Sequence, residues 1–188
     1  MDEALVAACL EQNRPAQQEL YVRFVGMMKG VCLRYAKDEM EAEDMLQEAF
    51  IHAFKNLDKY NHRGALGGWL RRLTVNKALE FCRKNASFQR AKDGYQQVQS
   101  DPVSESNEIF KQIGLEELVA KIQQLPAGYR TVFNLYAVEG YKHKEIAEKL
   151  QITVGTSKSQ YSNARQQLAE MIRQEQEDEL KRMAYAKQ

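Results

Sequence analysis

Acidic and basic side chains are separated in the first half of the chain, and this separation carries the clearest chemistry. Residues 37–60 contain seven acidic and three basic side chains, whereas residues 61–92 contain eight basic and one acidic. Residues 93–107 carry three acids and no base. An acidic block that lies next to a basic block is unusual in a chain that binds a single partner. The net charge of +1 does not reflect this separation, which indicates two different partners.

A second pattern, nearer the end of the chain, predicts two helices joined by a tight turn. Ile146, Ala147 and Leu150 form the inner face of a short helix. Residues 151–153 then form a turn, and Thr153 is a good N-cap for the helix that follows. The small side chain of Ala147 allows two helices to cross closely, so the pattern indicates a helix-turn-helix.

The outer face of this second helix is polar or basic. We expect it to consist of Thr156, Ser157, Lys158, Ser159, Gln160, Ser162, Asn163 and Arg165. Short hydrogen-bonding side chains without an acidic residue from 154 to 168 suit the major groove of DNA. Gln160 and Asn163 have the amide groups that pair with adenine. A plain helical hairpin with a solvated polar face is the alternative.

The spacings that catalytic and metal sites need do not occur in the sequence. The histidines stand far apart, at His52, His62 and His143. There is no HExxH motif, nucleophile elbow or phosphate-binding loop. The cysteines match no disulfide framework or paired metal motif and are expected to be buried; they are Cys9, Cys32 and Cys82. We therefore expect no enzyme activity, no metal site and no cofactor.

Apolar residues recur at helical spacing throughout, and glycine (10) and proline (3) are scarce among the 188 residues. The sequence therefore predicts an all-α fold. In the first half, the apolar pattern predicts helices that contain residues 20–31, 42–57 and 65–84. No apolar stretch reaches about eighteen residues and no secretory signal is visible, so we expect a cytoplasmic protein.

The polar stretch over residues 93–107 is the expected linker, because it contains Gly94 and Pro102 and has no helical period. It divides the chain into two small helical domains. The expected parts are residues 1–92, the linker 93–107, residues 108–172, and a charged tail over 173–188 that is a frayed helix or disordered.

Three segments, in this order, resemble the extracytoplasmic-function sigma factors of bacteria, which are small sigma subunits of RNA polymerase. The segments are AEDMLQEAFIHAFKNLDKY (42–60), GGWLRRLTVNKALEFCRK (67–84) and LPAGYRTVFNLYAVEGYKHKEIAEKLQITVGTSKSQYSNARQQL (125–168). The resemblance covers residues 5–172 and implies sigma domains two and four. The third domain of the large housekeeping sigma factors is missing, as in this family.

The resemblance assigns a role to each segment. It implies binding of core RNA polymerase through Glu41, Asp44, Gln47, Glu48 and His52. It implies melting and holding of the −10 promoter element through Asn61, Arg63, Arg71, Arg72, Asn76, Lys77, Arg83 and Lys84, with Asn76 near a base flipped from the duplex. The outer face from Thr156 to Arg165 would read the −35 element. An anti-sigma factor is a further implied partner.

A regulator that binds operators through its helix-turn-helix, and never joins polymerase, is the alternative function. The acidic segment and the basic segment argue against it, because such a regulator needs neither. We therefore expect a sigma factor that binds core polymerase and directs it to specific promoters.

Overall fold

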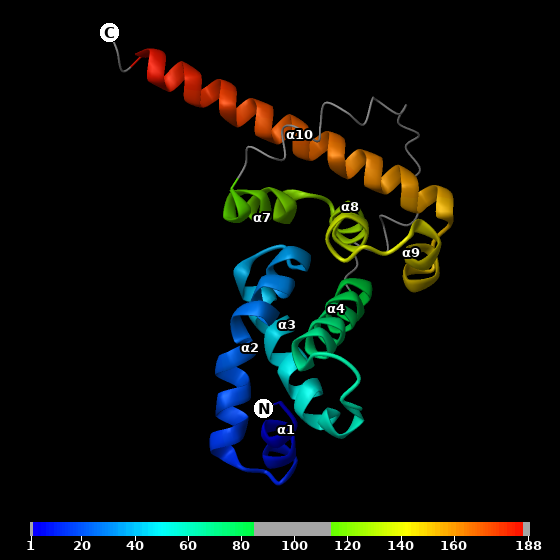
Figure 1. Ribbon diagram of the computed structural model, residues 1–188. Helices are drawn as coiled ribbons and strands as arrows, with labels where there is room; N and C mark the ends of the chain where they lie inside the picture. Colours follow the sequence, from blue (N-terminus) through cyan, green and yellow to red (C-terminus); the bar gives the residue numbers. More distant parts are fainter. Residues whose placement is uncertain (1, 85–113, 186–188) are drawn as a thin grey trace. The chain divides into compact units, whose positions relative to one another are not determined.

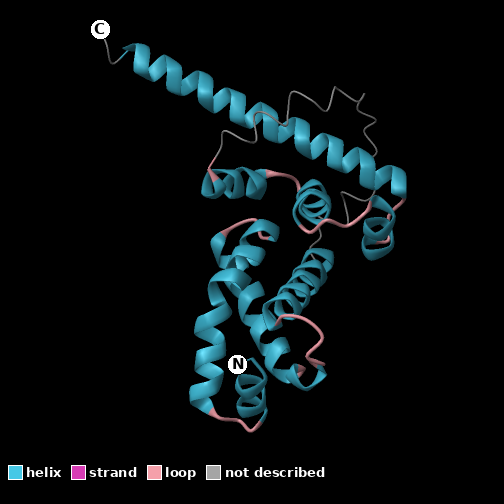
Figure 2. Cartoon of the chain, viewed as in Figure 1, coloured by secondary structure: helices cyan, strands magenta, loops and turns pink. Residues whose placement is uncertain are grey.

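The computed structural model describes residues 2–84 and 114–185, which fall into two compact units, residues 1–85 and 86–188. Every regular element among these residues is helical (Figures 1 and 2), so the all-α prediction is confirmed. The expected linker, residues 93–107, lies outside the described residues. No helix in the described ranges is both long enough and apolar enough to cross a membrane.

The N-terminal unit is built from helices that pack around one core. They are α1 (Asp2–Leu10), α2 (Arg14–Tyr35), α3 (Glu39–Lys55), the short η1 (Leu57–Lys59) and α4 (Leu66–Lys84). α2, α3 and α4 each contact the other two. The apolar stripe predicted along α3 is buried at every turn from Ala42 to Ala53, which confirms that helix. α1 was not predicted, although Leu5, Val6 and Cys9 give it a buried face.

All three cysteines are free and buried, as the sequence predicted. Cys82 on α4 points its Sγ at the carbonyl of Tyr35 at 3.9 Å. Burial raises the pKa of Cys32 to about 12, so this sulfur stays a protonated thiol that packs like a small apolar side chain.

The C-terminal unit contains α7 (Leu115–Gln124), α8 (Ala127–Phe133), the π-helical turn η2 (Asn134–Val138), α9 (His143–Leu150) and α10 (Val154–Tyr185). Its core is formed by Ile122, Leu125, Phe133, Ala164 and Leu168. η2 was not predicted, because one wider turn leaves no mark on apolar periodicity.

α9, the turn over residues 151–153 and the start of α10 form the predicted helix-turn-helix. Gln151 adopts the left-handed conformation (φ 55°) that ends α9. The backbone N–H of Thr156 donates to Oγ1 of Thr153 at 3.0 Å, so Thr153 caps α10 as expected.

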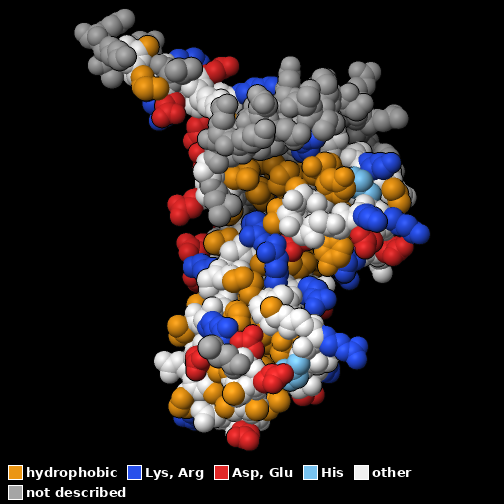
Figure 3. Space-filling model, viewed as in Figure 1, with side chains coloured by type: hydrophobic (Ala, Val, Ile, Leu, Met, Phe, Trp, Pro, Cys, Tyr) orange, Lys and Arg blue, Asp and Glu red, His pale blue; other side chains and the backbone are white. Residues whose placement is uncertain are grey.

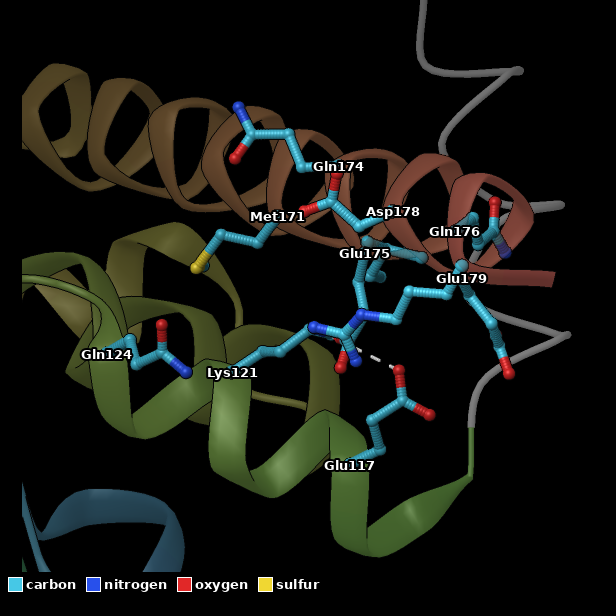
Figure 4. Close-up of a pocket in the computed structure, with 11 residues that line it drawn as sticks. Glu117, Lys121, Gln124, Met171, Gln174, Glu175, Gln176, Asp178 and Glu179 are labelled. Atoms are coloured by element: carbon cyan, nitrogen blue, oxygen red, sulfur yellow. Dashed lines mark hydrogen bonds and ion pairs between the residues drawn. The ribbon is translucent and has the colours of Figure 1, made fainter. Parts of the chain in front are cut away.

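α10 continues well beyond the helix-turn-helix, and residues 173–185 are helical, which is one of the two alternatives that the sequence left open for the charged tail. Figure 4 shows how this extension is held against α7. Lys121, whose side chain is 8% exposed, forms an ion pair with Glu175 and lies 3.9 Å from Glu117. A nearly buried ammonium needs such partners, because an unpaired buried charge is costly.

Candidate functional site

Two acids of α3, Asp44 and Glu48, form an exposed stripe together with Gln47. Asp44, Gln47 and Glu48 are exposed, as the sequence predicted for an outer face. The stripe borders an apolar groove between α2 and α3 whose lining includes Tyr21 and Ile51. Each of these two side chains is more than one-third exposed. Exposed apolar surface rimmed by charge is typical of a protein-binding surface.

Glu41 does not belong to this stripe, which corrects the sequence analysis. It is only 8% exposed, and its Oε2 accepts a hydrogen bond from the backbone N–H of Lys37 at 2.5 Å. In return, Oδ1 of Asp38 accepts from the backbone N–H of Glu41 at 2.8 Å. The two acids therefore cap the N-terminus of α3, and the Asp-x-x-Glu spacing was the signal for it.

His52 also departs from the predicted group, because it faces α4 rather than the acidic stripe. It lines a hollow of about 360 Å³ between α3 and α4. The other lining residues are Asn56, Lys59, Trp69, Arg72, Leu73, Asn76, Lys77 and Glu80. Burial lowers the pKa of His52, and the nearby Lys77 lowers it further.

This hollow brings together Arg72, Asn76 and Lys77, which the sequence assigned to one function. Arg72 and Asn76 are exposed at its edge. Lys77 donates to Oε2 of Glu80 at 2.7 Å, so part of its charge is neutralised. A cationic hollow with an aromatic wall is suited to a strand of nucleic acid, which needs positive charge along its backbone and a ring for stacking.

Sequence reasoning missed five of the nine residues that line the hollow, namely Asn56, Lys59, Trp69, Leu73 and Glu80. Asn56 donates through Nδ2 to the carbonyl of His52 at 2.8 Å, and Lys59 donates to Oδ1 of Asn56 at 2.6 Å. They follow the end of α3, outside the apolar stripe, so helical periodicity gave no signal. Trp69, near the start of α4, is half-buried.

The loop between η1 and α4 carries Asn61 and Arg63, both exposed as expected. The hydroxyl of Tyr60 donates a hydrogen bond to the carbonyl of Gly64 at 2.6 Å, which closes this loop. Oδ1 of Asn61 accepts from the backbone N–H of Arg63 at 3.1 Å. Gly64 has a φ of 103°, a conformation that is strained for any residue with a Cβ.

The remaining predicted residues of α4 lie at different depths. Lys84 is exposed, whereas Arg71 and Arg83 are half-buried and make contacts within the protein. Figure 3 shows several Lys and Arg side chains along α4 and the loop that precedes it. The basic segment is therefore a basic surface over part of its length only.

The exposed face of α10 contains fewer of the predicted residues than the sequence analysis expected. Lys158 is exposed and Ser159 and Ser162 are half-buried, as expected of a recognition surface. Five predicted members are instead buried: Thr156, Ser157, Gln160, Asn163 and Arg165. Gln166 and Gln167, which were not predicted, are exposed on the same helix.

Asn163 is the clearest of these corrections. It is 7% exposed, and its Nδ2 donates to the hydroxyl of Tyr129 at 3.1 Å. The guanidinium of Arg165 lies over the ring of Tyr161, at 5.8 Å from the ring centre. The first contact joins α10 to α8, and the second lies within α10 itself. Both side chains are engaged inside the unit and do not point outward as free readers of base edges.

His143, at the start of α9, gives this region its dependence on pH. Burial lowers the pKa of His143, and Lys158 lowers it further. The folded state therefore binds fewer protons than the unfolded state near neutral pH. The stabilisation from neutral His143 is complete above about pH 6.5 and is lost as the pH falls toward the lowered pKa.

Replacing Lys158 with Ala is expected to raise the pKa of His143, because it removes a positive charge that disfavours the imidazolium. NMR titration of the histidine rings measures the shift. Lys149→Ala is the matched control, since Lys149 lies over the ring of Tyr141 and is not a cause of the His143 shift. The prediction is contradicted if His143 has the same pKa in the wild type and in Lys158→Ala.

Within residues 2–84 and 114–185, no group of three or more His, Cys, Asp or Glu side chains is placed to hold a metal ion. The arrangement of the described side chains is that of binding surfaces: an acidic stripe beside an apolar groove, a cationic hollow, and a basic helix-turn-helix.

Comparison with known proteins places these surfaces in a family. The model of "Sigma-70 region 2" matches residues 20–88, and that of "Sigma-70, region 4" matches residues 115–168. The RNA polymerase sigma-H factor of Pseudomonas aeruginosa is 30% identical, over 88% of this chain and 90% of its own length. The ECF sigma factor SigW of Bacillus subtilis is 27% identical, over 91% of this chain and 98% of its own length.

The ECF sigma factor SigE of Mycolicibacterium smegmatis is 29% identical over 84% of this chain, which spans 62% of that relative. The two matched regions coincide with the two compact units, and the resemblance seen in the sequence analysis covers the same segments. The chain therefore belongs to the extracytoplasmic-function sigma factors of the sigma-70 family, which are subunits of bacterial RNA polymerase.

Proposed function

We propose that this sigma factor, which directs RNA polymerase to promoters, divides that task among three surfaces of its two units. The observation that carries the proposal is the separation of charge on the N-terminal unit, where the acids of α3 and the cations of α4 lie on different surfaces. A protein that met only DNA would gain nothing from an exposed acidic stripe.

The first surface is the stripe of Asp44, Gln47 and Glu48, which binds core polymerase. The neighbouring apolar groove supports this role, because it offers burial that charges alone cannot supply. The acids would orient and speed assembly with a basic partner. Glu41 contributes indirectly, by capping the helix that carries the stripe.

The second surface consists of the hollow between α3 and α4 with the loop over residues 61–64, and it takes the opened −10 strand. Arg72 and Lys59 would follow the phosphates, and Trp69 offers a ring against which a base can stack. Asn76, at the edge of the hollow, is within the reach of such a base. His52 belongs with this surface.

The third surface is the part of α10 around the exposed Lys158 and the half-buried Ser159 and Ser162, which reads the −35 element. Lys158 would contact phosphate, and the Ser162 hydroxyl can bond to either kind of base edge. The Ser159 hydroxyl donates to the carbonyl of Thr156 at 3.1 Å, so it would act as an acceptor. Because Gln160 and Asn163 are buried, adenine readout by these two amides is no longer the favoured assignment. Gln166, one turn beyond Ser162, carries an exposed amide that could pair with adenine instead.

The cellular location and the regulatory role of the chain follow from its assignment as a sigma factor. The chain acts in the cytoplasm, where the polymerase is, and as a regulatory subunit rather than as a catalyst. An anti-sigma factor that covers the α3 stripe would block core polymerase, and one that covers the α10 surface would block the −35 element. This partner follows from the family alone.

In vitro transcription tests the proposal. The full chain is mixed with core polymerase and a library of promoter sequences, and transcripts are counted for each sequence. We expect transcription from a small subset with common −10 and −35 elements, and none without the chain. Equal transcription from all sequences would contradict promoter selection, and binding to DNA with no binding to core polymerase would support an independent helix-turn-helix regulator.

A further inference from the structure

A histidine ties the two helices of the helix-turn-helix together. His143 is the first residue of α9, and its Nδ1 lies 2.9 Å from Oγ of Ser157 on α10. Ser157 is completely buried (0% exposed), so this hydroxyl has no access to water. The polypeptide already joins α9 to α10 at the other end of α9, through residues 151–153. α9 is therefore fixed to α10 at both of its ends.

Aromatic rings from two further positions hold the imidazole in place. The ring of Tyr136, on η2, stacks on His143 with centres 4.3 Å apart and planes inclined by 14°. The ring of Tyr161, on α10, meets His143 edge-on at 5.9 Å and lies 4.5 Å from Tyr136. A ring confined in this way has one orientation, so its Nδ1 presents a fixed hydrogen-bonding point to Ser157.

The hydrogen bond acts on the part of α10 that carries Lys158, Ser159 and Ser162. Ser157 directly precedes Lys158 and Ser159 and lies less than two turns before Ser162. Because a helix moves as a rigid element over such a length, a change in the angle between α9 and α10 displaces all three side chains together. Hydrogen bonds to base edges tolerate only a few tenths of an ångström in length, so a small displacement is enough to lose them.

We infer that His143 is a positioning residue for promoter recognition, which acts through Ser157 to fix the angle at which α10 presents Lys158, Ser159 and Ser162 to the major groove. The inference rests on the proposed role of α10 at the −35 element. His143 itself does not contact DNA in this account. Its effect falls on the preference among sequences, while the attraction to any phosphate backbone is unchanged.

The test uses the full chain in holoenzyme and two DNAs, one with the preferred −35 element and one with that element scrambled. The measured quantity is the ratio of the two affinities. Ser157→Ala removes only the hydroxyl group, and His143→Phe keeps a stacking ring but removes the nitrogen. Each is expected to lower the ratio several-fold and to leave affinity for the scrambled DNA unchanged. The double variant is expected to lose no more than the larger single loss, because both changes remove the same bond.

His143→Asn provides the rescue, because its amide places a polar atom near the position of Nδ1. We expect it to retain most of the wild-type ratio although it lacks the ring. Wild-type affinity ratios in both Ser157→Ala and His143→Phe overturn the inference. It is also overturned if the variants lose affinity equally for both DNAs and this loss follows a loss of thermal stability. A wild-type holoenzyme that does not distinguish the two DNAs overturns the proposed −35 role itself, which separates the two failures.

Discussion

Replacing Asp44 and Glu48 with Lys lowers the affinity of the chain for core RNA polymerase roughly tenfold or more. Both carboxylates are exposed on α3, so the change places two cations on the surface proposed to meet a basic partner. Like charges brought together across an interface cost several kcal/mol, and about 1.4 kcal/mol is a factor of ten. Titration of labelled polymerase with the variant measures the loss, which shrinks as salt screens the charges.

Glu11→Lys with Glu19→Lys is the matched control, since it makes the same charge change at exposed positions of the same unit. It is expected to bind as the wild type does. Glu41→Ala is the second comparison: loss of the cap destabilises the unit by about 1 kcal/mol, while the folded variant still binds. Unchanged polymerase binding by a well-folded Asp44→Lys, Glu48→Lys double variant removes α3 from the interface.

The helices were largely predictable because each buries a regular apolar stripe. α3 repeats small and large apolar residues at spacings of three and four, and the structure buries them all from Ala42 to Ala53. The sequence left open whether the far end of α10 is helical or disordered, for a physical reason. Beyond Ile172 its stability depends on ion pairs such as Lys121 with Glu175, which lie far apart in sequence and leave no periodic signal.

The candidate site was less predictable, because periodicity identifies one buried face of a helix and assumes that the rest is free. α10 packs against both α8 and α9, so two flanks of the helix are covered. Asn163 faces Tyr129 of α8, and Ser157 faces His143 of α9. Polar residues can fill such positions when they find a hydrogen-bonding partner. The exposed strip is therefore narrower than composition suggests.

His52 was misplaced for a related reason. It follows the acidic residues of α3 in sequence, and the segment was treated as one surface. An α-helix turns about 100° at each residue, so four residues give a net rotation of about 40° beyond one full turn. His52 therefore lies on the flank of α3, beside the face that carries Glu48. There it meets Lys77 and Glu80 of α4. Only the packing of α4 on α3 shows that His52 joins the basic group.

Replacing Arg72 with Glu slows the formation of open promoter complexes roughly tenfold or more and leaves binding to core polymerase unchanged. Arg72 is exposed at the edge of the hollow, beside Asn76, so the change puts a negative charge where the opened strand is proposed to pass. A single strand is held mainly by cations along its backbone and by stacked bases. An acid at this point repels the phosphates and also forms no contact that releases a counterion.

The rate of open-complex formation, followed by a fluorescent base within the −10 element, measures the effect at two salt concentrations. Arg14→Glu makes the same charge change at the exposed start of α2 and is expected to keep the wild-type rate. A general loss of net charge would slow both variants alike, whereas a strand that passes the hollow makes Arg72 alone sensitive. An Arg72→Glu holoenzyme that opens promoters at the wild-type rate at both salt concentrations therefore excludes the hollow from the path of the DNA.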